Sequence, residues 1–402
     1  MSLERPGTDG EDASSNIKTG QLAKMITEMG PNISEIARRL GQFKESVRYR
    51  YKEKLLNKGF AVRVAVDHEK LGLRRVVMVI DFSDGYRDVA ELMLHILSNE
   101  GYLVAFHKIL PDGKFLVHSS VPDEHVEAYR EFFNGLTEKG YFQTLEFYTF
   151  SWFRNPSMKT EMYDFDEGVW DFDWSTESKT DKQAASHMPS ARERFDSTDL
   201  LILKQLQMDG NKSLAEMAET LRINYKTLTW HYRKHIDERK LIKGYVINWM
   251  GTKYDYKADR ALNKKHTYLY VAVLFSDLDN AKRVDVRARL NLLPFIWSEA
   301  VGDHYEAELV LPLESITEGL QYLAEVISET KTNARYFIID QSHALSFSVI
   351  PELYDESKQR WNFNEEALMG RFENLIVKTK GMQQKAGSRR SAGPSIKHAG
   401  RG

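Results

Sequence analysis

Residues 195–245 read FDSTDLLILKQLQMDGNKSLAEMAETLRINYKTLTWHYRKHIDERKLIKGY, and this stretch decides the fold. Leucines at positions 200, 203 and 206 recur at helical spacing and predict an amphipathic helix that ends near Asp209. Ser213 and Glu216 form a capping box, in which the serine oxygen accepts an amide hydrogen bond at the start of a second helix. A short turn leads to a third helix, so the pattern is typical of a helix-turn-helix head followed by a strand.

The same pattern occurs earlier in the chain. Subtracting 181 from each position places the second and third helices of that stretch on residues 32–51 without a gap. Asn32 and Glu35 again form a capping box, and apolar residues fall at matching helical positions. The chain therefore contains two predicted three-helix heads. Residues 60–66 then alternate apolar and other side chains, as the strand of a wing does.

Each head is followed by a segment with a different pattern. Residues 76–153 are expected to form strand, helix, strand, strand, helix and strand, and residues 267–350 repeat that order. Phe-Ser-Asp at 82–84 returns at 275–277, so an insertion is expected between the second head and its sheet, at 251–265. This order is that of the ferredoxin-like unit. We predict an α+β fold with two winged helix-turn-helix domains, each followed by a ferredoxin-like (βαββαβ) domain.

The predicted domain boundaries follow the changes in composition. They are 1–15, disordered; 16–68, first winged helix-turn-helix; 69–154, first ferredoxin-like domain; 155–194, acidic aromatic linker; 195–250, second winged helix-turn-helix; 251–352, second ferredoxin-like domain; 353–378, C-terminal helix; and 379–402, basic disordered tail. The aromatic residues of the linker are expected to dock on a neighbouring domain. Alternatively, the linker covers a basic surface when DNA is absent.

The composition is that of a soluble globular protein, with 42% hydrophobic and 28% charged residues. No apolar run is long enough to span a membrane, and the absence of cysteine excludes disulfides and thiolate catalysis. We expect a cytoplasmic location. The net charge is −2, but residues 18–63 hold eleven basic and four acidic residues, and the tail from Lys378 holds seven basic and no acidic residues. Such local basic surface suits the phosphates of double-stranded DNA.

The outward face of each third helix supplies the candidate DNA contacts, because a major groove admits one helix. In the first head these are Lys44, Ser46, Arg48, Tyr49, Arg50 and Lys52. In the second head they are Asn224, Lys226, Thr227, Thr229, Trp230, His231, Arg233 and Lys234. Arg50 is the preferred candidate for a guanine contact. The two aromatic side chains at equivalent positions can also pack against protein rather than read bases.

Two motifs of the second head carry a family resemblance. Its opening is Asp-x-x-Asp-x-x-Ile-Leu at 196–203 and its close is Leu-Ile-Lys-Gly-Tyr at 241–245. These residues resemble the head of the Lrp/AsnC (feast/famine) transcription regulators, and the ferredoxin-like unit resembles the RAM domain of that family. Both heads have one extra residue between the third helix and the wing. The resemblance to this family covers most of residues 17–350. The head and the ferredoxin-like unit each occur twice in this one chain.

The resemblance implies a sequence-specific regulator whose two non-identical heads read an imperfect palindrome. The two sheets are expected to pair within the chain as a pseudo-dimer, and further association into homo-oligomers stays open. A small-molecule effector would sit at the turn between the second and third strands. Neither copy keeps the effector motif of the family, so we expect an altered ligand or none, with Asp303, His304 and Glu306 as the candidate contacts.

Two other functions remain open. A branch that resembles this family, the siroheme decarboxylases, uses the same two-domain plan for tetrapyrrole chemistry, with Arg75, His107 and His118, or His304, as candidates for binding or proton transfer. Alternatively, the heads bind protein and the chain is a non-enzymatic interaction hub. The sequence shows no convincing catalytic constellation, phosphate-binding loop or metal-ligand cluster. We therefore expect no enzyme activity, no cofactor and no metal.

Overall fold

The structure is a computed structural model and describes residues 18–174, 190–248, 268–346 and 348–391. It has a mixed α+β architecture, which confirms the predicted fold class at that level. The segment predicted to be disordered at 1–15 and the insertion expected at 251–265 lie outside the described residues.

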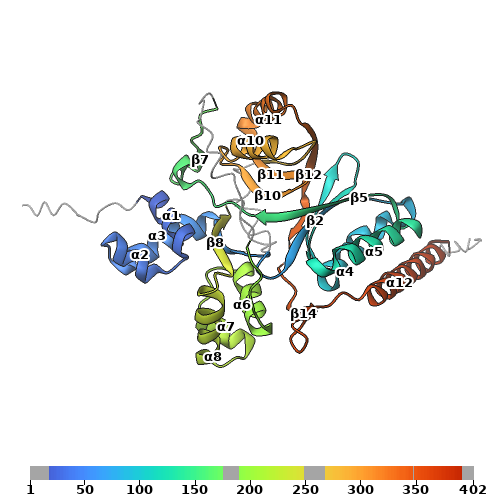
Figure 1. The fold of residues 1–402 in the computed structure, drawn as a ribbon, viewed down its shortest axis with the longest axis horizontal. Helices are drawn as coiled ribbons and strands as arrows, with labels where there is room; N and C mark the ends of the chain where they lie inside the picture. Colours follow the sequence, from blue (N-terminus) through green and yellow to red (C-terminus); the bar gives the residue numbers. More distant parts are fainter. Residues whose placement is uncertain (1–17, 175–189, 249–267, 347, 392–402) are drawn as a thin grey trace, which may run out of the picture.

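The first head contains three short α-helices and a strand (Figure 1). These are α1 (Thr19–Met29), α2 (Ile33–Leu40), α3 (Lys44–Arg50), the π-helix η1 (Tyr51–Leu55), the 3-10 helix η2 (Leu56–Lys58) and β1 (Ala61–Val66). The side chain of Asn32 accepts a hydrogen bond from the backbone N–H of Glu35 at 3.2 Å, which is one half of the predicted capping box. The carboxylate of Glu35 accepts hydrogen bonds from Arg38 and Arg39 instead of completing the box. Ile36 and Val47 are fully buried and hold α2 and α3 together.

The second head repeats this order. It contains α6 (Ser197–Met208), α7 (Leu214–Leu221), α8 (Tyr225–His231), the π-helix η6 (Tyr232–Asp237) and β8 (Ile242–Asn248). Asp196 with Asp199, and Ser213 with Glu216, form complete capping boxes. Each third helix runs directly into a π-helical turn. Because a π-turn holds more residues than an α-turn, it accommodates the extra residue before each wing.

The wings of the two heads pair with each other. β1 lies antiparallel to β8, from Ala61 opposite Asn248 to Val66 opposite Ile242. Each wing therefore covers the hydrogen-bonding edge of the other, and the two heads are joined through one two-stranded sheet (Figure 1).

Eight longer strands close into one barrel. They are β2 (Leu73–Phe82), β3 (Leu103–Leu110), β4 (Phe115–Pro122), β5 (Phe142–Arg154), β9 (Tyr268–Ser276), β10 (Ile296–Gly302), β11 (Tyr305–Pro312) and β12 (Asn333–Ser346). The order around the barrel is β10-β11-β9-β12-β3-β4-β2-β5. Strands from the two halves of the chain meet at two seams, β3 with β12 and β5 with β10. The pairing within the chain is thus edge to edge.

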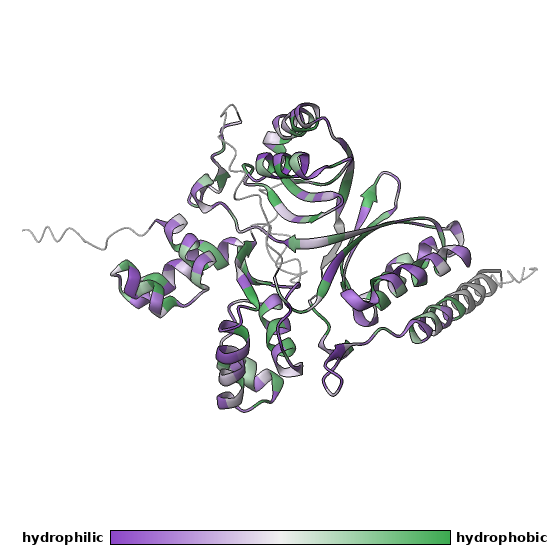
Figure 2. Ribbon diagram, in the orientation of Figure 1, coloured by the Kyte–Doolittle hydropathy of each residue, from purple (hydrophilic) through white to green (hydrophobic). Residues whose placement is uncertain are grey.

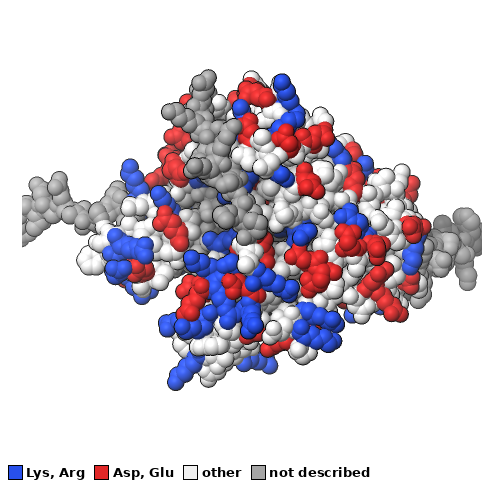
Figure 3. All heavy atoms as spheres, viewed as in Figure 1, with Lys and Arg blue, Asp and Glu red and all other residues white. Residues whose placement is uncertain are grey.

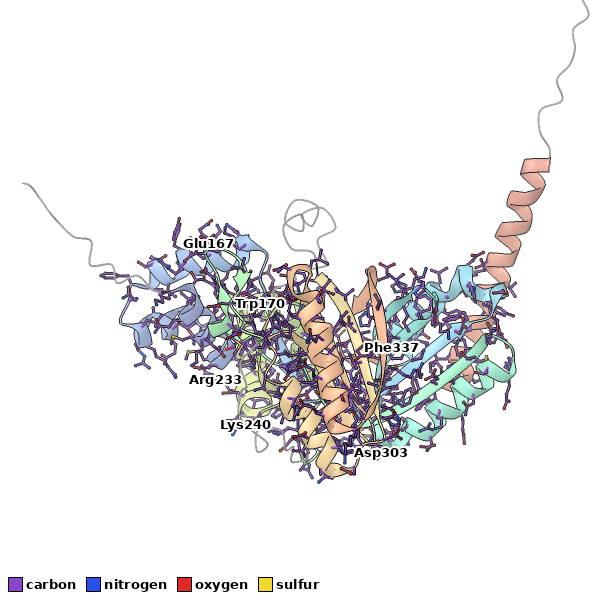
Figure 4. The ribbon with its side chains drawn as sticks, turned by 90° about the horizontal axis from the view of Figure 1, so that it is seen from above. Glu167, Trp170, Arg233, Lys240, Asp303 and Phe337 are labelled. Atoms are coloured by element: carbon purple, nitrogen blue, oxygen red, sulfur yellow. The ribbon has the colours of Figure 1, made fainter. Side chains whose placement is uncertain are left out.

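Helices cover the outside of the barrel. They are η3 (Asp84–Val89), α4 (Ala90–Glu100), η4 (Asp123–His125) and α5 (Val126–Glu138) on one half, and α10 (Asn280–Leu290), η7 (Leu313–Ser315) and α11 (Ile316–Thr330) on the other. Side chains alternate along the strands, so Met78 packs under the helices while Val77 and Val79 join the apolar interior with Phe337. Figure 2 shows the apolar strands between helices whose outer faces are polar, and Figure 4 shows Phe337 among the strands.

Two small hairpins pack against other parts of the chain. The first is η5 (Thr160–Met162) with β6 (Tyr163–Asp164) and β7 (Val169–Trp170), and the second is η8 (Pro351–Leu353) with β13 (Tyr354–Asp355) and β14 (Arg360–Trp361). Tyr163 packs on Phe60 of the first head, while Trp170 packs on Phe295 beneath the second set of helices. Trp361 donates a hydrogen bond to the carbonyl of Leu71 at 2.9 Å. The aromatic residues of the linker thus dock on neighbouring parts of the chain.

The last helix, α12, runs from Glu365 to Ser391, beyond the expected end at Lys378. Its first turns pack on the helices of the first barrel half through Leu368 and Phe372. None of the described helices is both long and apolar enough to cross a membrane.

A glycine at one seam tests the closure of the barrel. A Cβ at Gly302 would lie 2.7 Å from the carbonyl oxygen of Thr149 and 3.0 Å from the Cα of Phe150, both backbone atoms of β5. We expect Gly302→Ala to lower the free energy of unfolding by on the order of 1–3 kcal/mol, because the seam must separate. Urea unfolding at equilibrium measures this change.

Gly135→Ala is the matched control. Nothing lies within 4 Å of a Cβ at this position in α5, and alanine favours the helix, so this variant should gain up to about 1 kcal/mol. Equal losses in both variants would contradict the tight seam.

Candidate functional site

The third helix of the first head presents most of its predicted DNA contacts to solvent. Lys44, Ser46, Arg48, Tyr49 and Lys52 are exposed, and Arg50 is half-buried. Arg48 forms an ion pair with Glu45 at 2.8 Å, so part of its charge is already balanced. The face is accessible but not uniformly basic.

In the second head the predicted residues divide into two groups. Asn224, Lys226, Thr227, Trp230, Arg233 and Lys234 are exposed, whereas Thr229 is half-buried. His231 is also half-buried and turns inward, with its Nδ1 3.0 Å from Asp199 Oδ1. It therefore does not lie on the outward face where the sequence pattern placed it. Figure 3 shows Lys and Arg side chains gathered around the second head, with acidic side chains among them.

The three predicted effector contacts do not form one site. Asp303 is exposed at the turn between β10 and β11, and Figure 4 shows it at the edge of the molecule, well away from Arg233 in the second head. His304 packs edge-on against Tyr148, with ring centroids 4.9 Å apart. Glu306 is 2% exposed and points into the barrel, because side chains alternate along β11.

A polar cluster lies inside the barrel, at the inward positions of strands from both halves of the chain. We call it the barrel cluster. It consists of Arg75 on β2, His107 on β3, His118 on β4, Tyr270 on β9, Ser298 on β10, and Glu306 and Glu308 on β11, all of them buried. The neighbouring inward positions are apolar. Closure of the barrel brings these residues together from about 230 positions apart in the chain.

Short contacts join the histidines of the first half to the glutamates of the second. His118 Nε2 lies 2.7 Å from Glu306 Oε1, and His107 Nε2 lies 3.2 Å from Glu308 Oε1. Ser298 donates a hydrogen bond to Glu308. The two imidazole rings have centroids 5.5 Å apart. The cluster is thus a compact acid-base network without bulk water around it.

The electrostatics of the barrel cluster favour charged pairs. Burial opposes the protonated form of His118, but the carboxylates of Glu306 and Glu308 outweigh it and raise the pKa of His118 above its ordinary value of 6.5. Burial disfavours the anion of Glu308, yet the charges of His118 and His107 dominate and hold the pKa of Glu308 below its ordinary value. The carboxylates therefore favour the protonated form of His118.

Several buried polar atoms of the cluster have no hydrogen-bond partner among the described residues, and Nδ1 of His118 and Nε of Arg75 are two of them. The guanidinium of Arg75 stacks on the ring of Phe153, with its central carbon 3.5 Å from the centroid, and burial lowers the pKa of Arg75 to about 10. Buried polar groups are nearly always satisfied, so unsatisfied donors indicate where a ligand binds.

A pocket lies outside the barrel. Residues of η3, α4 and the β3–β4 hairpin line a pocket of about 610 Å³. Its basic side chains include Arg87, but Asp81 and Asp84 already form ion pairs with Arg87. Asp88, Glu91 and Asp112 add negative charge, so this pocket is poorly suited to a polyanionic ligand.

Four of the seven residues of the barrel cluster were predicted from the sequence. Arg75, His107 and His118 were candidates for binding or proton transfer and Glu306 was a candidate effector contact at a turn, whereas Tyr270, Ser298 and Glu308 were not predicted. The period-2 pattern of β11, with acidic residues at 306 and 308 between apolar ones, is the available signal for inward-facing carboxylates. The histidines that these carboxylates contact, His118 and His107, can be identified only from the closed barrel.

Comparisons with known proteins find a likeness in structure alone. No protein-family model and no curated protein sequence matches the chain. A crystal structure of the siroheme decarboxylase NirDL is 11% identical, with a TM-score of 0.52, and the match covers 89% of this chain and 99% of that one. The same enzyme in complex with an iron-uroporphyrin III analogue is 8% identical, with a TM-score of 0.50, over 90% and 99% of the two chains.

A regulator structure matches a smaller part. The leucine response regulatory protein of Mycobacterium tuberculosis is 21% identical, with a TM-score of 0.25, over 36% of this chain and 92% of that one. NirDL shares a fold with this chain over nearly all of its length. The prediction that the chain is not an enzyme is contradicted, because both full-length matches are structures of an enzyme.

The barrel cluster predicts a pH dependence of stability. The raised pKa of His118 adds stability that is complete below about pH 6.5 and is lost as pH rises through the folded-state pKa. The lowered pKa of Glu308 adds stability that is complete above about pH 4.5 and is lost as pH falls. The cluster should therefore add most to the free energy of unfolding between about pH 4.5 and pH 6.5. Urea unfolding at a series of pH values from 4 to 9 measures this contribution.

Glu306→Gln is the informative variant. Losing this carboxylate lowers the pKa of His118, so stability should begin to fall at a lower pH on the alkaline side, with a cost on the order of 2 kcal/mol near pH 6. Glu318→Gln, at an exposed position of α11, is the control. The same pH profile in the Glu306 variant and the wild type would rule out the ion pair.

Proposed function

We propose that this chain is an enzyme of the siroheme-decarboxylase type that acts on a carboxylate-bearing tetrapyrrole. The barrel cluster carries the proposal, because it offers a buried guanidinium, whose Nε has no hydrogen-bond partner among the described residues, together with a proton donor. The full-length likeness to NirDL, one structure of which is a complex with an iron-uroporphyrin III analogue, supports the same conclusion.

Arg75 supplies the group that binds substrate. A buried guanidinium whose Nε has no hydrogen-bond partner among the described residues is costly, and a carboxylate of the substrate would supply that partner. Its stacking on Phe153 fixes the plane of the guanidinium, which suits a two-point contact with a carboxylate. The acidic side chains of a tetrapyrrole provide such carboxylates.

His118 supplies the proton that decarboxylation needs. When the bond between the side-chain carbon and its carboxylate breaks, carbon dioxide leaves and the carbon keeps the electron pair. The N–H at Nδ1 of His118 donates a proton to that carbon, and the other ring nitrogen stays hydrogen-bonded to Glu306. Glu306 thereby keeps the imidazole charged before the step and correctly oriented during it.

We also infer that the chain arose as two fused copies of a head and a ferredoxin-like unit. Strand registers support this, since Val77 faces His118 in the first unit as Tyr270 faces Val310 in the second. An apolar residue, Val310, thus stands where the first unit has His118. Conversely, Leu116 stands where the second unit has Glu308, because Val79 faces Leu116 as Ala272 faces Glu308. The two units have diverged and form a single polar site between them.

Turnover of siroheme by the purified full chain tests the proposal. His118→Gln should lower the rate by at least about 100-fold because the proton donor is lost. Arg75→Gln should mainly weaken binding of the tetrapyrrole, which its absorbance spectrum reports. Loss of carbon dioxide is measured as a mass decrease of the tetrapyrrole.

The matched control is His304→Gln, which removes a histidine outside the barrel. This variant should retain the activity of the wild type. If wild-type protein neither binds nor decarboxylates the tetrapyrrole, or if His118→Gln is as active as the wild type, the proposal fails.

DNA binding by the heads is a second candidate function. The observation that favours it is the exposure of Lys226, Arg233 and Lys234 on one third helix and of Arg48 and Lys52 on the other. Partial neutralisation weakens the case, since Lys234 pairs with Glu238 at 2.6 Å. Two heads joined by their wings would meet the duplex as one unit.

Charge reversal separates this function from catalysis. The double variant Arg48→Glu with Lys52→Glu should abolish gel shifts of duplex DNA at low salt, because each phosphate contact contributes to a salt-dependent affinity. The same variant should leave the decarboxylase rate unchanged, since neither residue lies in the barrel. Unchanged DNA affinity would exclude the third helix of the first head as the contact.

A further inference from the structure

We propose that the second head contains a binding site for a divalent transition-metal ion, formed by Asp196, Asp199, His231 and His235. The proposal is independent of the reaction in the barrel. The four residues lie at the junction of the first and third helices of the head, which we call the head cluster. One ligand atom from each residue lies within 4.8 Å of the other three.

Local sequence spacing aligns the side chains of each pair. Asp196 caps α6 and Asp199 is the third residue of that helix, so their side chains face each other across its first turn. His231 and His235 are four residues apart along α8 and η6 and therefore lie on one face of the third helix. Arg233, labelled in Figure 4, lies between them in the chain. Two histidines at this spacing are a common pair of metal ligands.

The distances match a tetrahedral site. His231 Nδ1 lies 3.0 Å from an oxygen of Asp199 and 3.4 Å from an oxygen of Asp196. His235 Nδ1 lies 2.8 Å and 3.7 Å from oxygens of the same two residues. A tetrahedron with metal–ligand bonds of about 2.0–2.1 Å has edges of about 3.3–3.4 Å. Both imidazoles thus direct the same nitrogen to the point where a metal would sit.

Each carboxylate uses one oxygen in the capping box and keeps the other for an ion, since Asp199 Oδ2 accepts from the backbone N–H of Asp196. In the capping box Asp196 Oδ1 accepts from the backbone N–H of Asp199, which leaves Oδ2 facing the imidazoles. Asp199 is fully buried beside a second carboxylate, an arrangement that a cation stabilises. Trp230 packs edge-on against both histidine rings, at 5.1 Å and 4.7 Å between centroids, and holds them in place.

The ligand set selects the class of metal. Two imidazole nitrogens and two carboxylate oxygens suit Zn²⁺ and neighbouring divalent transition ions such as Co²⁺. Mg²⁺ and Ca²⁺ prefer sites of oxygen ligands alone, with six or more of them. A bound ion would tie the start of the first helix to the third helix and so fix the orientation of the exposed face of the head.

Metal titration of the full chain tests this site. After treatment with a chelator, the protein is titrated with Zn²⁺ alone in competition with a chromophoric chelator, and separately with Co²⁺, whose visible spectrum reports tetrahedral coordination. We expect one tight equivalent per chain. The double variant His231→Gln with His235→Gln should lose it.

Asp196→Asn is the conservative variant. Asparagine caps helices as well as aspartate does, so the fold is kept while one carboxylate ligand is removed. It should weaken Zn²⁺ binding by at least about tenfold. Zn²⁺ should also raise the thermal midpoint of this variant less than that of the wild type. The Asp196→Asn variant therefore tests the site even if the double histidine variant does not fold.

His107→Gln with His118→Gln is the matched control, since these histidines and Glu308 also lie close together. This variant should retain the tight equivalent. Loss of the equivalent in the control but not in the head variants, a cobalt spectrum without tetrahedral bands, or no binding at all would overturn the proposal and leave the head cluster as a purely hydrogen-bonded contact.

Discussion

Edge-to-edge pairing of two sheets is the constraint on which the rest of this structure depends. Each four-stranded sheet has helices on one face, so its other face and its edges must be covered. Pairing β3 with β12 and β5 with β10 covers both at once and encloses a common interior. The interior then holds side chains that neither half could bury alone. The hairpins that carry Trp170 and Trp361 add contacts with other parts of the chain, since Trp170 packs on Phe295 and Trp361 donates a hydrogen bond to Leu71.

Enclosing charge in such an interior is costly, and the arrangement of the barrel cluster reflects this. Each histidine faces a glutamate, so the desolvation of four ionisable groups is offset by contact between opposite charges. Arg75 differs from the histidines, because its guanidinium stacks on the ring of Phe153 and shares the charges of Glu306 and Glu308 with them. Its Nε has no hydrogen-bond partner among the described residues, and binding of an anionic substrate would supply one.

The heads illustrate how similar local patterns acquire different chemistry. Both third helices end in a π-turn, and both wings join the same small sheet. Only in the second head do two histidines turn inward onto the capping carboxylates of the first helix. Some predicted DNA contacts of the second head therefore lie on its outer surface, whereas His231 contacts Asp199 inside the head. Packing of the third helix on the first decides which side chains turn inward, and helical spacing alone does not.

By itself, the sequence determined the local elements. Helical spacing, the capping boxes at Asn32 and Ser213 and the period-2 strands predicted the helices and strands with boundaries close to those observed, because these signals act within a few residues. It also singled out Arg75, His107 and His118. Only the tertiary structure decided that Glu306 leaves the predicted effector turn and meets His118 inside a barrel, and that His231 meets Asp199. These contacts join residues 188 and 32 positions apart, and no short-range pattern encodes which distant strand or helix will supply the partner of a buried charge.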